Sequence, residues 1–500
     1  MTVSQALSVI NATEKTANAL YHAMGLIYYD AATFAPKGSV EVRANTNGEL
    51  SRIVYELITS ESQQEALETL YPVRDTLSAI DKRRVEELYR SYNETKKIPV
   101  DEMVEFEMHL AESDAVWHKA KEENDYASFE PYLQKTFDTL KRFAGYTDPD
   151  KDPYDVQLDK YEKGLTQEKC DIFFDSLRAR LVPLIAKVKA AKQIDDSKLR
   201  QVFPIEKQKK FSEFLIDVMD INWDNFTIAE TEHPFTTNFT KKDVRITTHY
   251  YEDNFASSMY SVIHEGGHAL YELGTGDEYM GTCLGGGVSM GIHESQSRFY
   301  ENIIGRSREF CALILPYLKK EFPDQMDGIE VDDMYRMINR SEPSLIRIEA
   351  DELTYCLHVM VRYELEKKMF RGEITAKDLP SEWNRLYKEY LGVDVPDDKR
   401  GVLQDSHWSN ANIGYFPSYA LGSAYGAQML AEMKKDIDVS AAIAGGKLTS
   451  INDWLCEKIW RHGGMYDPTV LFEMVCGEFD PNVFVDYLEE KFTEIYGLGE

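Results

Sequence analysis

The sequence predicts a predominantly α-helical protein with a small β element beside one central helix. Apolar residues recur every three or four positions over long stretches, as in an amphipathic helix. Few segments alternate strictly between apolar and polar residues, as a half-buried strand does. The 500 residues are 43% hydrophobic, which is enough for a large core, and no linker-like or low-complexity stretch divides them. We therefore expect a single domain over residues 1–500, with room for two lobes.

The clearest helical periods lie in residues 166–189 and 353–370. Pro183 falls inside the first stretch and predicts a kink or a break there. Residues 243–250 are the best strand candidate, because β-branched and apolar side chains alternate along one side. Residues 274–291 contain seven glycines, too many for a helix when each interior glycine costs about 1 kcal/mol. We expect a loop or a β-hairpin in that segment, after the central helix.

Composition excludes several classes of function. The formal net charge of −30 repels phosphate backbones, so we expect no nucleic-acid partner. The first residues show no basic region followed by an apolar one, and no run of about 18 apolar residues occurs, so we expect neither a secretory signal nor a membrane segment. Six irregularly spaced cysteines are typical of reduced thiols. These features together predict a cytoplasmic protein.

The central helix carries an H-E-x-x-H motif, formed by residues 264–268. On a helix, His264 and His268 lie one turn apart on the same face, where both imidazoles can bind one zinc ion. Glu265 would then lie beside the metal and could take a proton from a bound water molecule. The flanking residues are apolar, which predicts a buried helix, and the two glycines inside the motif indicate that another group approaches closely.

A third metal ligand is needed, and the metzincin layout does not supply it. That layout places glycine three residues and histidine six residues after His268, where this chain has Tyr271 and Gly274. In the other common arrangement, the third ligand is a carboxylate from a following segment. Two histidines and one carboxylate leave the fourth position of a catalytic zinc ion open. The candidates downstream of the motif are Glu272, Glu278, Glu294 and Glu301.

Of these four we choose Glu294. Glu272 lies one turn past His268 on the same helix, where its carboxylate could not easily meet the metal beside both imidazoles. Glu278 falls in the glycine-rich segment. Glu294 lies near the start of the helix that residues 292–303 predict, so this helix could carry its carboxylate to the two histidines.

Six short segments of the chain carry distinctive motifs. They are H-P-F at 233–235, D-x-R-x-T at 243–247, H-E-x-x-H at 264–268, H-E-S-Q-S at 293–297, I-R-x-x-A-D at 346–351 and G-x-x-Q-D-x-H-W at 401–408. In this order they resemble the motifs of the carboxypeptidase Taq family of zinc carboxypeptidases. Residues 29–33 are similar to a further family motif, W-D-x-x-T, with Tyr29 in place of tryptophan. The resemblance thus covers nearly the whole chain.

The resemblance implies a large helical fold with a long deep groove, related in shape to neurolysin-like peptidases. It also implies a homodimer, Glu294 as the third ligand, and removal of single residues from the free C-terminus of peptides with broad side-chain tolerance. Zinc is the expected cofactor, although a site built from nitrogen and oxygen ligands also accepts cobalt.

The motifs suggest roles for further side chains. With Glu265 as general base, a second donor should assist zinc in stabilising the oxyanion; the candidates are Tyr415, Tyr419, His233 and His407. The substrate carboxylate suits a planar guanidinium, for which we favour Arg347 over Arg245.

Neighbouring motif residues suggest how these arginines are supported. We expect Asp351 to pair with Arg347 or to accept the free N–H of a ligand histidine, and Asp243 to orient Arg245. Phe235 and Trp408 could close one end of the groove, although core packing is an equally good prediction for Trp408.

Three other interpretations compete with a carboxypeptidase. A zinc oligopeptidase would cleave internal bonds and would accept substrates with a blocked C-terminus. A peptide-binding metalloprotein without catalytic activity would have no need of Glu265. A structural zinc site would have four protein ligands, often cysteines, and only Cys283 lies close to the motif in sequence.

Overall fold

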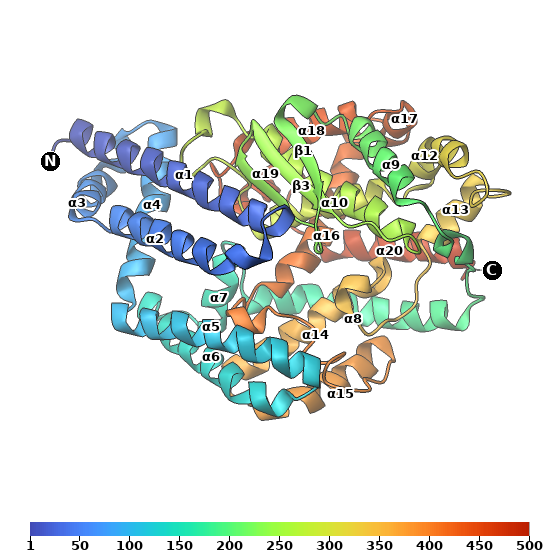
Figure 1. Ribbon diagram of the computed structural model, residues 1–500, viewed down its shortest axis with the longest axis horizontal. Helices are drawn as coiled ribbons and strands as arrows, with labels where there is room; N and C mark the ends of the chain where they lie inside the picture. The colour runs from blue at the N-terminus through green and yellow to red at the C-terminus, as the bar shows by residue number, and fades with distance from the viewer. Residues whose placement is uncertain (500) are drawn as a thin grey trace.

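The computed structural model describes residues 1–499 and confirms a predominantly helical protein with one small sheet (Figure 1). The elements in chain order are α1 (Val3–Thr33), α2 (Val40–Ile58), α3 (Glu61–Leu70), α4 (Ala79–Lys97), α5 (Val100–Glu123), α6 (Tyr126–Thr147), α7 (Pro153–Tyr161), α8 (Gln167–Ala190), α9 (Ile205–Val218), β1 (Phe226–Glu230), β2 (Thr236–Thr240), β3 (Asp243–Thr248), α10 (Phe255–Gly274), α11 (Met290–Arg298), α12 (Arg308–Glu321), α13 (Val331–Ile338), α14 (Glu352–Arg371), α15 (Leu379–Leu391), α16 (Phe416–Asp436), α17 (Val439–Ala444), α18 (Thr449–Lys458), α19 (Pro468–Cys476) and α20 (Pro481–Tyr496).

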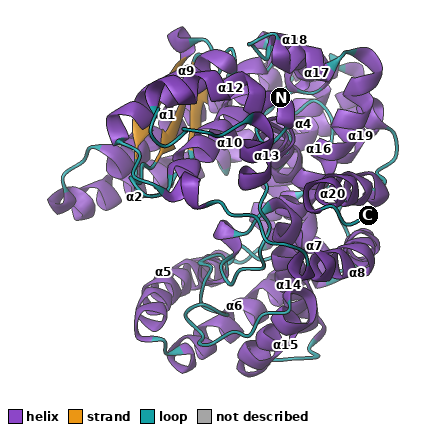
Figure 2. Ribbon diagram, turned by 90° about the vertical axis from the view of Figure 1, so that its right-hand side faces the viewer, coloured by secondary structure: helices purple, strands orange, loops and turns teal. Residues whose placement is uncertain are grey.

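The helices fall into two groups that share one core. Figure 2 shows α5, α6, α14 and α15 at its lower end, with the sheet, α1, α9 and α12 at its upper end. The buried apolar side chains nevertheless form one continuous cluster that includes residues of both groups. A small second cluster lies between α1, α3 and α4, where it joins the N-terminal helices to one another.

The two helices predicted most clearly from the sequence are present as α8 and α14. Thr166 caps α8, since its hydroxyl accepts a hydrogen bond from the Lys169 N–H, and Asp351 caps α14 in the same way. The break predicted at Pro183 is absent, because α8 continues through it to Ala190. Buried residues on both sides of the proline pack α8 against α14 and α20, and this packing outweighs the lost backbone hydrogen bond.

The sheet has the strand order β1-β3-β2 and precedes the central helix. β3 is the predicted strand; it pairs in parallel with β1 and antiparallel with β2. Val244 and Ile246 are fully buried at its centre. The other two strands are short and half-exposed, so their sequences carry no clear alternation. The sheet packs on α10, where the hydroxyls of Thr248 and Ser261 lie 3.2 Å apart.

The segment after the central helix forms the loop of the two alternatives predicted for it, and no β-hairpin occurs there among the described residues. Within the described chain, the glycine-rich segment between α10 and α11 contains a single 3₁₀ turn, Asp277–Tyr279, and no strand. Some of its backbone N–H groups bond to nearby carbonyl oxygens in turns, and others bond to side chains, with Cys283 donating to Glu14 and Gly287 donating to Glu272. These bonds replace the partners that a strand would have provided.

None of the helices within residues 1–499 combines the length and the apolar character that spanning a bilayer demands.

Candidate metal centre

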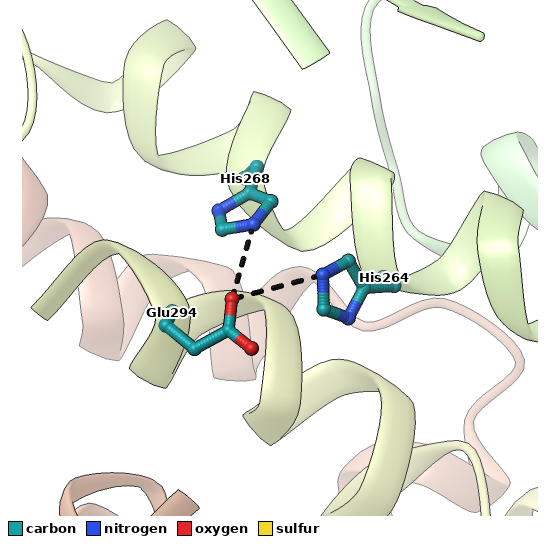
Figure 3. Close-up of side chains that lie close together, drawn as sticks. All are labelled: His264, His268 and Glu294. Atoms are coloured by element: carbon teal, nitrogen blue, oxygen red, sulfur yellow. Dashed lines mark ion pairs between the residues drawn. The ribbon is translucent and has the colours of Figure 1, made fainter. Parts of the chain in front are cut away.

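Three side chains from two helices converge on one another (Figure 3). His264 and His268 project from α10, and Glu294 projects from α11. The Nε2 atoms of the histidines lie 3.7 and 3.5 Å from Oε2 of Glu294, and the three potential ligand atoms lie within 4.8 Å of one another. No second group of three such side chains occurs in the described part of the chain. The sequence-based ligand set therefore comes together in space.

Glycines allow the helices that carry these side chains to approach. A Cβ atom at Gly267 would lie 2.7 Å from the Gln296 carbonyl oxygen and 2.8 Å from Ser297 Cα, so α10 contacts the backbone of α11 directly. On the other side of α11, a Cβ atom at Gly422 of α16 would lie 2.6 Å from Glu294 Cγ. For Gly267, the close approach that the motif predicts is thus the contact between α10 and α11.

Hydrogen bonds orient the potential ligands. The Nδ1 atom of His264 lies 2.8 Å from Oε2 of Glu301, and the Nδ1 atom of His268 lies 2.6 Å from Nδ1 of His293. Both rings therefore turn Nε2 toward Glu294. The Oε1 atom of Glu294 accepts a hydrogen bond of 2.7 Å from Arg298 Nε, which leaves Oε2 facing the histidines. Two imidazole nitrogens and one carboxylate oxygen fit a catalytic zinc site with an open position.

The ionisation of Glu294 and His268 suits a cation. For His264, burial lowers the pKa, but the carboxylates of Glu294 and Glu301 outweigh this effect and raise it. Burial by itself would raise the pKa of Glu294, but Arg298 and then His264 hold it well below its usual range. Burial lowers the pKa of His268 to about 4, against a smaller opposing effect of Glu294. At neutral pH, Glu294 is therefore ionised and His268 is neutral, which are the forms that bind metal.

A π-helical turn places two of the supporting groups. Residues 299–304 continue α11 as a π-helix, and Arg298 and Glu301 lie at and just after the junction. Arg298 donates to Glu301 Oε2 at 3.1 Å as well as to Glu294, so it links the two carboxylates that contact His264. Short π-helical turns are frequent at functional sites because they redirect side chains within a helix.

Glu265 lies in the same helix, with its carboxylate held by the sheet. The hydroxyl of Thr236, at the start of β2, donates to Glu265 Oε2 at 2.6 Å. Burial raises the pKa of Glu265, although His264 and the Thr236 hydroxyl act in the opposite direction. A raised pKa makes this carboxylate a better proton acceptor. The sequence analysis missed Thr236, which directly follows the H-P-F segment.

A second cluster contains Arg347, His407, Tyr415 and Tyr419. The guanidinium of Arg347 lies 5.0 Å from the Tyr419 ring centroid, and the Tyr419 hydroxyl lies 3.1 Å from His407 Nε2. The rings of His407 and Tyr415 stack with centroids 5.6 Å apart. Burial lowers the pKa of His407 to about 4 and raises that of Tyr415 to about 12. Both groups are therefore neutral near pH 7.

Arg347 is 5% exposed and is held on two sides. Its Nε and Nη2 atoms donate to Asp405 Oδ1 at 3.1 and 2.9 Å, and its Nη1 atom donates to the Tyr355 hydroxyl at 3.1 Å. The guanidinium of Arg298 stacks over the ring of Tyr355, 4.2 Å from its centroid. Tyr355 therefore connects the Arg347 cluster, through Arg298, to the group formed by His264, His268 and Glu294. The sequence motifs contained Asp405 but gave no sign of its partner.

The roles predicted for Asp351 are wrong. Arg347 pairs with Asp405, and no histidine contacts Asp351 among the described residues. The Asp351 carboxylate instead accepts from the backbone of Leu353 and Thr354 and from the Ser341 hydroxyl. A buried helix N-terminus needs such an acceptor for its free N–H groups, and this need decides where Asp351 points.

Within residues 1–499, no hydrogen bond or ring contact joins the side chain of Arg245 or of His233 to the two clusters. Asp243 orients Arg245 as predicted, by accepting from its Nε at 2.7 Å and from its Nη2 at 2.8 Å. The guanidinium also stacks between Tyr29 and Phe239, at 4.9 and 4.8 Å. His233 lies on an exposed turn before β2, and within residues 1–499 no hydrogen bond joins its side chain to the metal cluster.

Trp408 packs in the core, the second of its two predicted roles. Its ring lies against Phe137 and Trp383, and its Nε1 atom donates to Glu366 Oε1 at 2.7 Å. Phe235 is half-buried, with its ring edge-on to Tyr28 at 5.4 Å.

Comparisons with known proteins agree over nearly the full length. Residues 9–492 match the sequence model of the family described as Carboxypeptidase Taq (M32) metallopeptidase. "Carboxypeptidase 1" of Bacillus subtilis is 40% identical over 479 residues, which cover 95% of this chain and 96% of that protein. "Thermostable carboxypeptidase 1" of Pyrococcus furiosus is 37% identical over 484 residues, or 95% and 96%. The crystal structure of an M32 carboxypeptidase from Deinococcus radiodurans superposes with a TM-score of 0.96 at 35% identity, covering 98% of this chain and 99% of that one.

Proposed function

Because this chain belongs to the carboxypeptidase Taq (M32) family of metallopeptidases, we propose that it removes C-terminal residues from peptides with a zinc ion held by His264, His268 and Glu294. As a member of this family it is a metallocarboxypeptidase, which favours C-terminal over internal cleavage. The single observation that carries the site assignment is the convergence of these three side chains, whose potential ligand atoms lie within 4.8 Å of one another.

The chemistry follows from the proposed ligands and Glu265. Zinc bound by two neutral imidazoles and one carboxylate would act as a Lewis acid and would lower the pKa of a water molecule at the open position. Glu265 takes a proton from the attacking water and delivers it to the leaving amine. Thr236 supports this role because its hydrogen bond of 2.6 Å fixes Oε2 of the Glu265 carboxylate and leaves Oε1 without that donor.

Tyrosine hydroxyls from the second cluster are the proposed donors to the developing oxyanion. Tyr415 and Tyr419 are half-exposed, whereas Phe416 between them is buried. If His407 donates through Nε2 to the Tyr419 oxygen, the Tyr419 proton remains free for a substrate oxygen. His407 thus supports Tyr419 in this scheme, and His233 remains the candidate farthest from these contacts.

Arg347 is the proposed anchor for the substrate carboxylate. A net charge of −30 opposes an anionic group, so a specific local cation is required. Asp405 occupies one edge of the Arg347 guanidinium and Tyr355 contacts Nη1, but protons on both terminal nitrogens remain for a carboxylate. Arg245 remains the second candidate.

The remaining parts of the proposal rest on composition and resemblance. We propose zinc as the resident metal, with cobalt as an active substitute, since nitrogen and oxygen ligands admit both. The whole chain would form one catalytic unit within a cytoplasmic homodimer. All six cysteines are free thiols, which suits a reducing compartment.

The proposal is tested with one peptide prepared with a free and an amidated C-terminus, and with mass spectrometry of the products. The wild type should release single residues from the free form and leave the amidated form intact. Glu265→Gln should keep zinc, measured by elemental analysis, and should lose about 10²–10⁴-fold in kcat because the general base is removed.

Glu278→Gln serves as the control, since Glu278 is an exposed carboxylate of the glycine-rich segment. This variant should match the wild type in both zinc content and kcat. Cleavage of the amidated peptide at internal bonds would favour an oligopeptidase, and full activity of Glu265→Gln would refute the mechanism. A wild type that binds zinc but cleaves neither peptide would indicate a binding protein.

A further inference from the structure

His293 and Glu272 form a hydrogen-bonded chain behind His268. We propose that these two residues position His268, by holding its ring in the tautomer that binds a metal through Nε2. The inference rests on the proposed metal site, and neither residue is among its ligands. His293 directly precedes Glu294 on α11, while Glu272 lies one turn after His268 on α10.

Two hydrogen-bond contacts connect His268 in a line through the His293 ring to the carboxylate of Glu272. The Nδ1 atoms of His268 and His293 lie 2.6 Å apart, and their ring centroids are 4.7 Å apart. On its opposite edge, His293 Nε2 lies 2.7 Å from Oε1 of Glu272. The line uses both nitrogens of His293, so this ring cannot bind a metal without losing one of its partners.

The proton positions along the line follow from the carboxylate at its end. Ionised Glu272 can only accept, so His293 Nε2 must carry a proton. In the tautomer that carries its proton on Nε2, His293 presents a lone pair on Nδ1, which can accept the proton of His268 Nδ1. The Nε2 atom of His268 is consequently unprotonated and faces Glu294. One carboxylate thus determines the tautomers of two histidines in series.

Glu272 is itself fixed by two other parts of the fold. Its Oε2 atom accepts from Asn238 Nδ2 of β2 at 2.6 Å, and its Oε1 atom accepts from the backbone N–H of Gly287 at 3.1 Å. The residue is 7% exposed. Three donors therefore hold this buried carboxylate, and they come from a strand, a loop and a helix. Its geometry explains why it is a support and not the third ligand.

The glycine-rich segment encloses the pair. A Cβ atom at Gly287 would lie 2.5 Å from His293 Cδ2 and 2.8 Å from Tyr271 Cε1. Only a residue without a side chain can bring its N–H to Glu272 while both rings occupy that space. The requirement for glycine at this position is therefore explained by the packing of His293.

The other ligand histidine is supported differently. His264 Nδ1 contacts Glu301 directly at 2.8 Å, with no ring between them. A direct carboxylate contact of this kind is common among metal-binding histidines, and removal of such supports typically weakens metal binding by 10–100-fold. His268 obtains the equivalent support from Glu272, with the His293 ring between the two residues.

Zinc affinity measured by competition with a chromogenic chelator tests the proposal. We expect His293→Ala and Glu272→Ala each to weaken zinc binding by about 10–100-fold relative to the wild type. His293→Asn should lose less than His293→Ala, since an asparagine oxygen can take the place of Nδ1 as acceptor from His268. Excess zinc should restore most of the peptidase activity of these variants.

Two further variants make the outcomes distinguishable. His249→Ala is the matched control, because His249 is a half-buried histidine that bonds to the Thr231 carbonyl and lies outside the line; it should bind zinc as the wild type does. His268→Ala is the reference for loss of a ligand. Circular dichroism establishes that each variant is folded, and His293→Phe, which lacks the acceptor nitrogen, replaces the alanine variants if they are not.

The result that overturns the proposal is zinc affinity within twofold of the wild type for His293→Ala and Glu272→Ala, while His268→Ala binds weakly. If the alanine variants do not fold, the same result for His293→Phe, which keeps a ring but has no acceptor nitrogen, overturns it. If His268→Ala also binds zinc normally, the metal site itself is wrong and the positioning role fails with it. A loss of activity that excess zinc does not restore, at unchanged affinity, would likewise contradict a role that acts through His268.

Discussion

At the scale of single residues, the proposed metal site depends on which atoms of each side chain are already engaged. His264 and His268 both use Nδ1 for a hydrogen bond, and Glu294 uses Oε1. The Nε2 atoms of the two histidines face Oε2 of Glu294, which also accepts a hydrogen bond of 3.1 Å from the Ser297 hydroxyl. The H-E-x-x-H pattern identifies the residues, whereas the hydrogen bonds around them select the atoms.

Arg347 provides the prediction at this scale. Arg347→Lys should weaken inhibition by an N-acyl amino acid with a free carboxylate by about 10–100-fold, since a hydrogen bond between charged groups contributes about 1.5–3 kcal/mol. Lysine keeps the charge but cannot bind both a carboxylate and Asp405 in a planar arrangement. Inhibition by the corresponding amide should change little, and inhibition constants for the two compounds provide the measurement.

The same measurement on Arg245→Lys separates the two candidate arginines. This variant should leave both inhibition constants near those of the wild type. If Arg245→Lys weakens inhibition by the acid but not by the amide, and Arg347→Lys does not, then Arg245 and not Arg347 binds the substrate carboxylate. Thermal unfolding of both variants separates binding effects from loss of stability.

At the scale of elements, α10, α11 and α16 place the site because glycines remove side chains from their contacts. Gly267 faces the backbone of α11, whereas a Cβ atom at Gly266 would lie 2.7 Å from Cε at the end of the Met219 side chain. Backbone atoms cannot move without shifting a whole helix, but a methionine can change its rotamer. The two adjacent glycines therefore differ in how much they tolerate a methyl group.

This difference leads to a prediction for the pair. Gly267→Ala should destabilise the protein by about 1–3 kcal/mol and weaken zinc binding, because it forces apart the helices that carry His268 and Glu294. Gly266→Ala is the matched control, since it adds the same methyl group and the same helix propensity one residue earlier. Urea unfolding and chelator competition measure the two effects. Equal losses for both variants would contradict direct contact between α10 and α11 as the cause.

At the scale of the whole molecule, buried carboxylates join distant segments of the chain. Glu162 follows α7 and is 1% exposed, and its Oε2 atom accepts from the backbone N–H of Gly291 at the start of α11 at 2.9 Å. Burial raises the pKa of Glu162 to about 7, although Ser289 and the Gly291 N–H act to lower it. The contact spans 129 residues of sequence.

The raised pKa of Glu162 makes folding sensitive to pH. Below about pH 4.5 the carboxyl is protonated in both folded and unfolded chains, and its contribution to stability is complete. As the pH rises from about 4.5 to about 7, the unfolded chain releases the proton first, and stability falls by about 1.4 kcal/mol per pH unit. Above the folded pKa the loss is complete and becomes constant.

Glu162→Gln should remove this dependence. The free energy of unfolding of the variant minus that of the wild type should rise by about 2–3 kcal/mol between pH 5 and pH 7.5, measured by urea unfolding with a chelator in all samples. Glu122→Gln, which changes an exposed carboxyl, is the control and should show a constant difference. A constant difference for Glu162→Gln as well would show that its carboxyl is ionised throughout.

Local patterns in the sequence predicted much of the architecture. Helical periods correctly predicted α8 and α14, and alternation predicted β3, because each pattern reflects the burial of one face of one element. The spacing of His264 and His268 belongs to the same category, since four residues along a helix always return to the same face. Glu294 followed from the next predicted helix and from the H-E-S-Q-S segment.

The sequence by itself therefore determined the fold class, the metal-binding motif and the resemblance to a family. Only the tertiary structure decided the partners of these residues. Asp405 lies 58 residues from Arg347, and Glu301 lies 37 residues from His264, so no periodic pattern relates them. Asp351 was misassigned because a helix start competes for its carboxylate. Contacts between distant segments depend on how helices pack, and packing is a property of the whole fold.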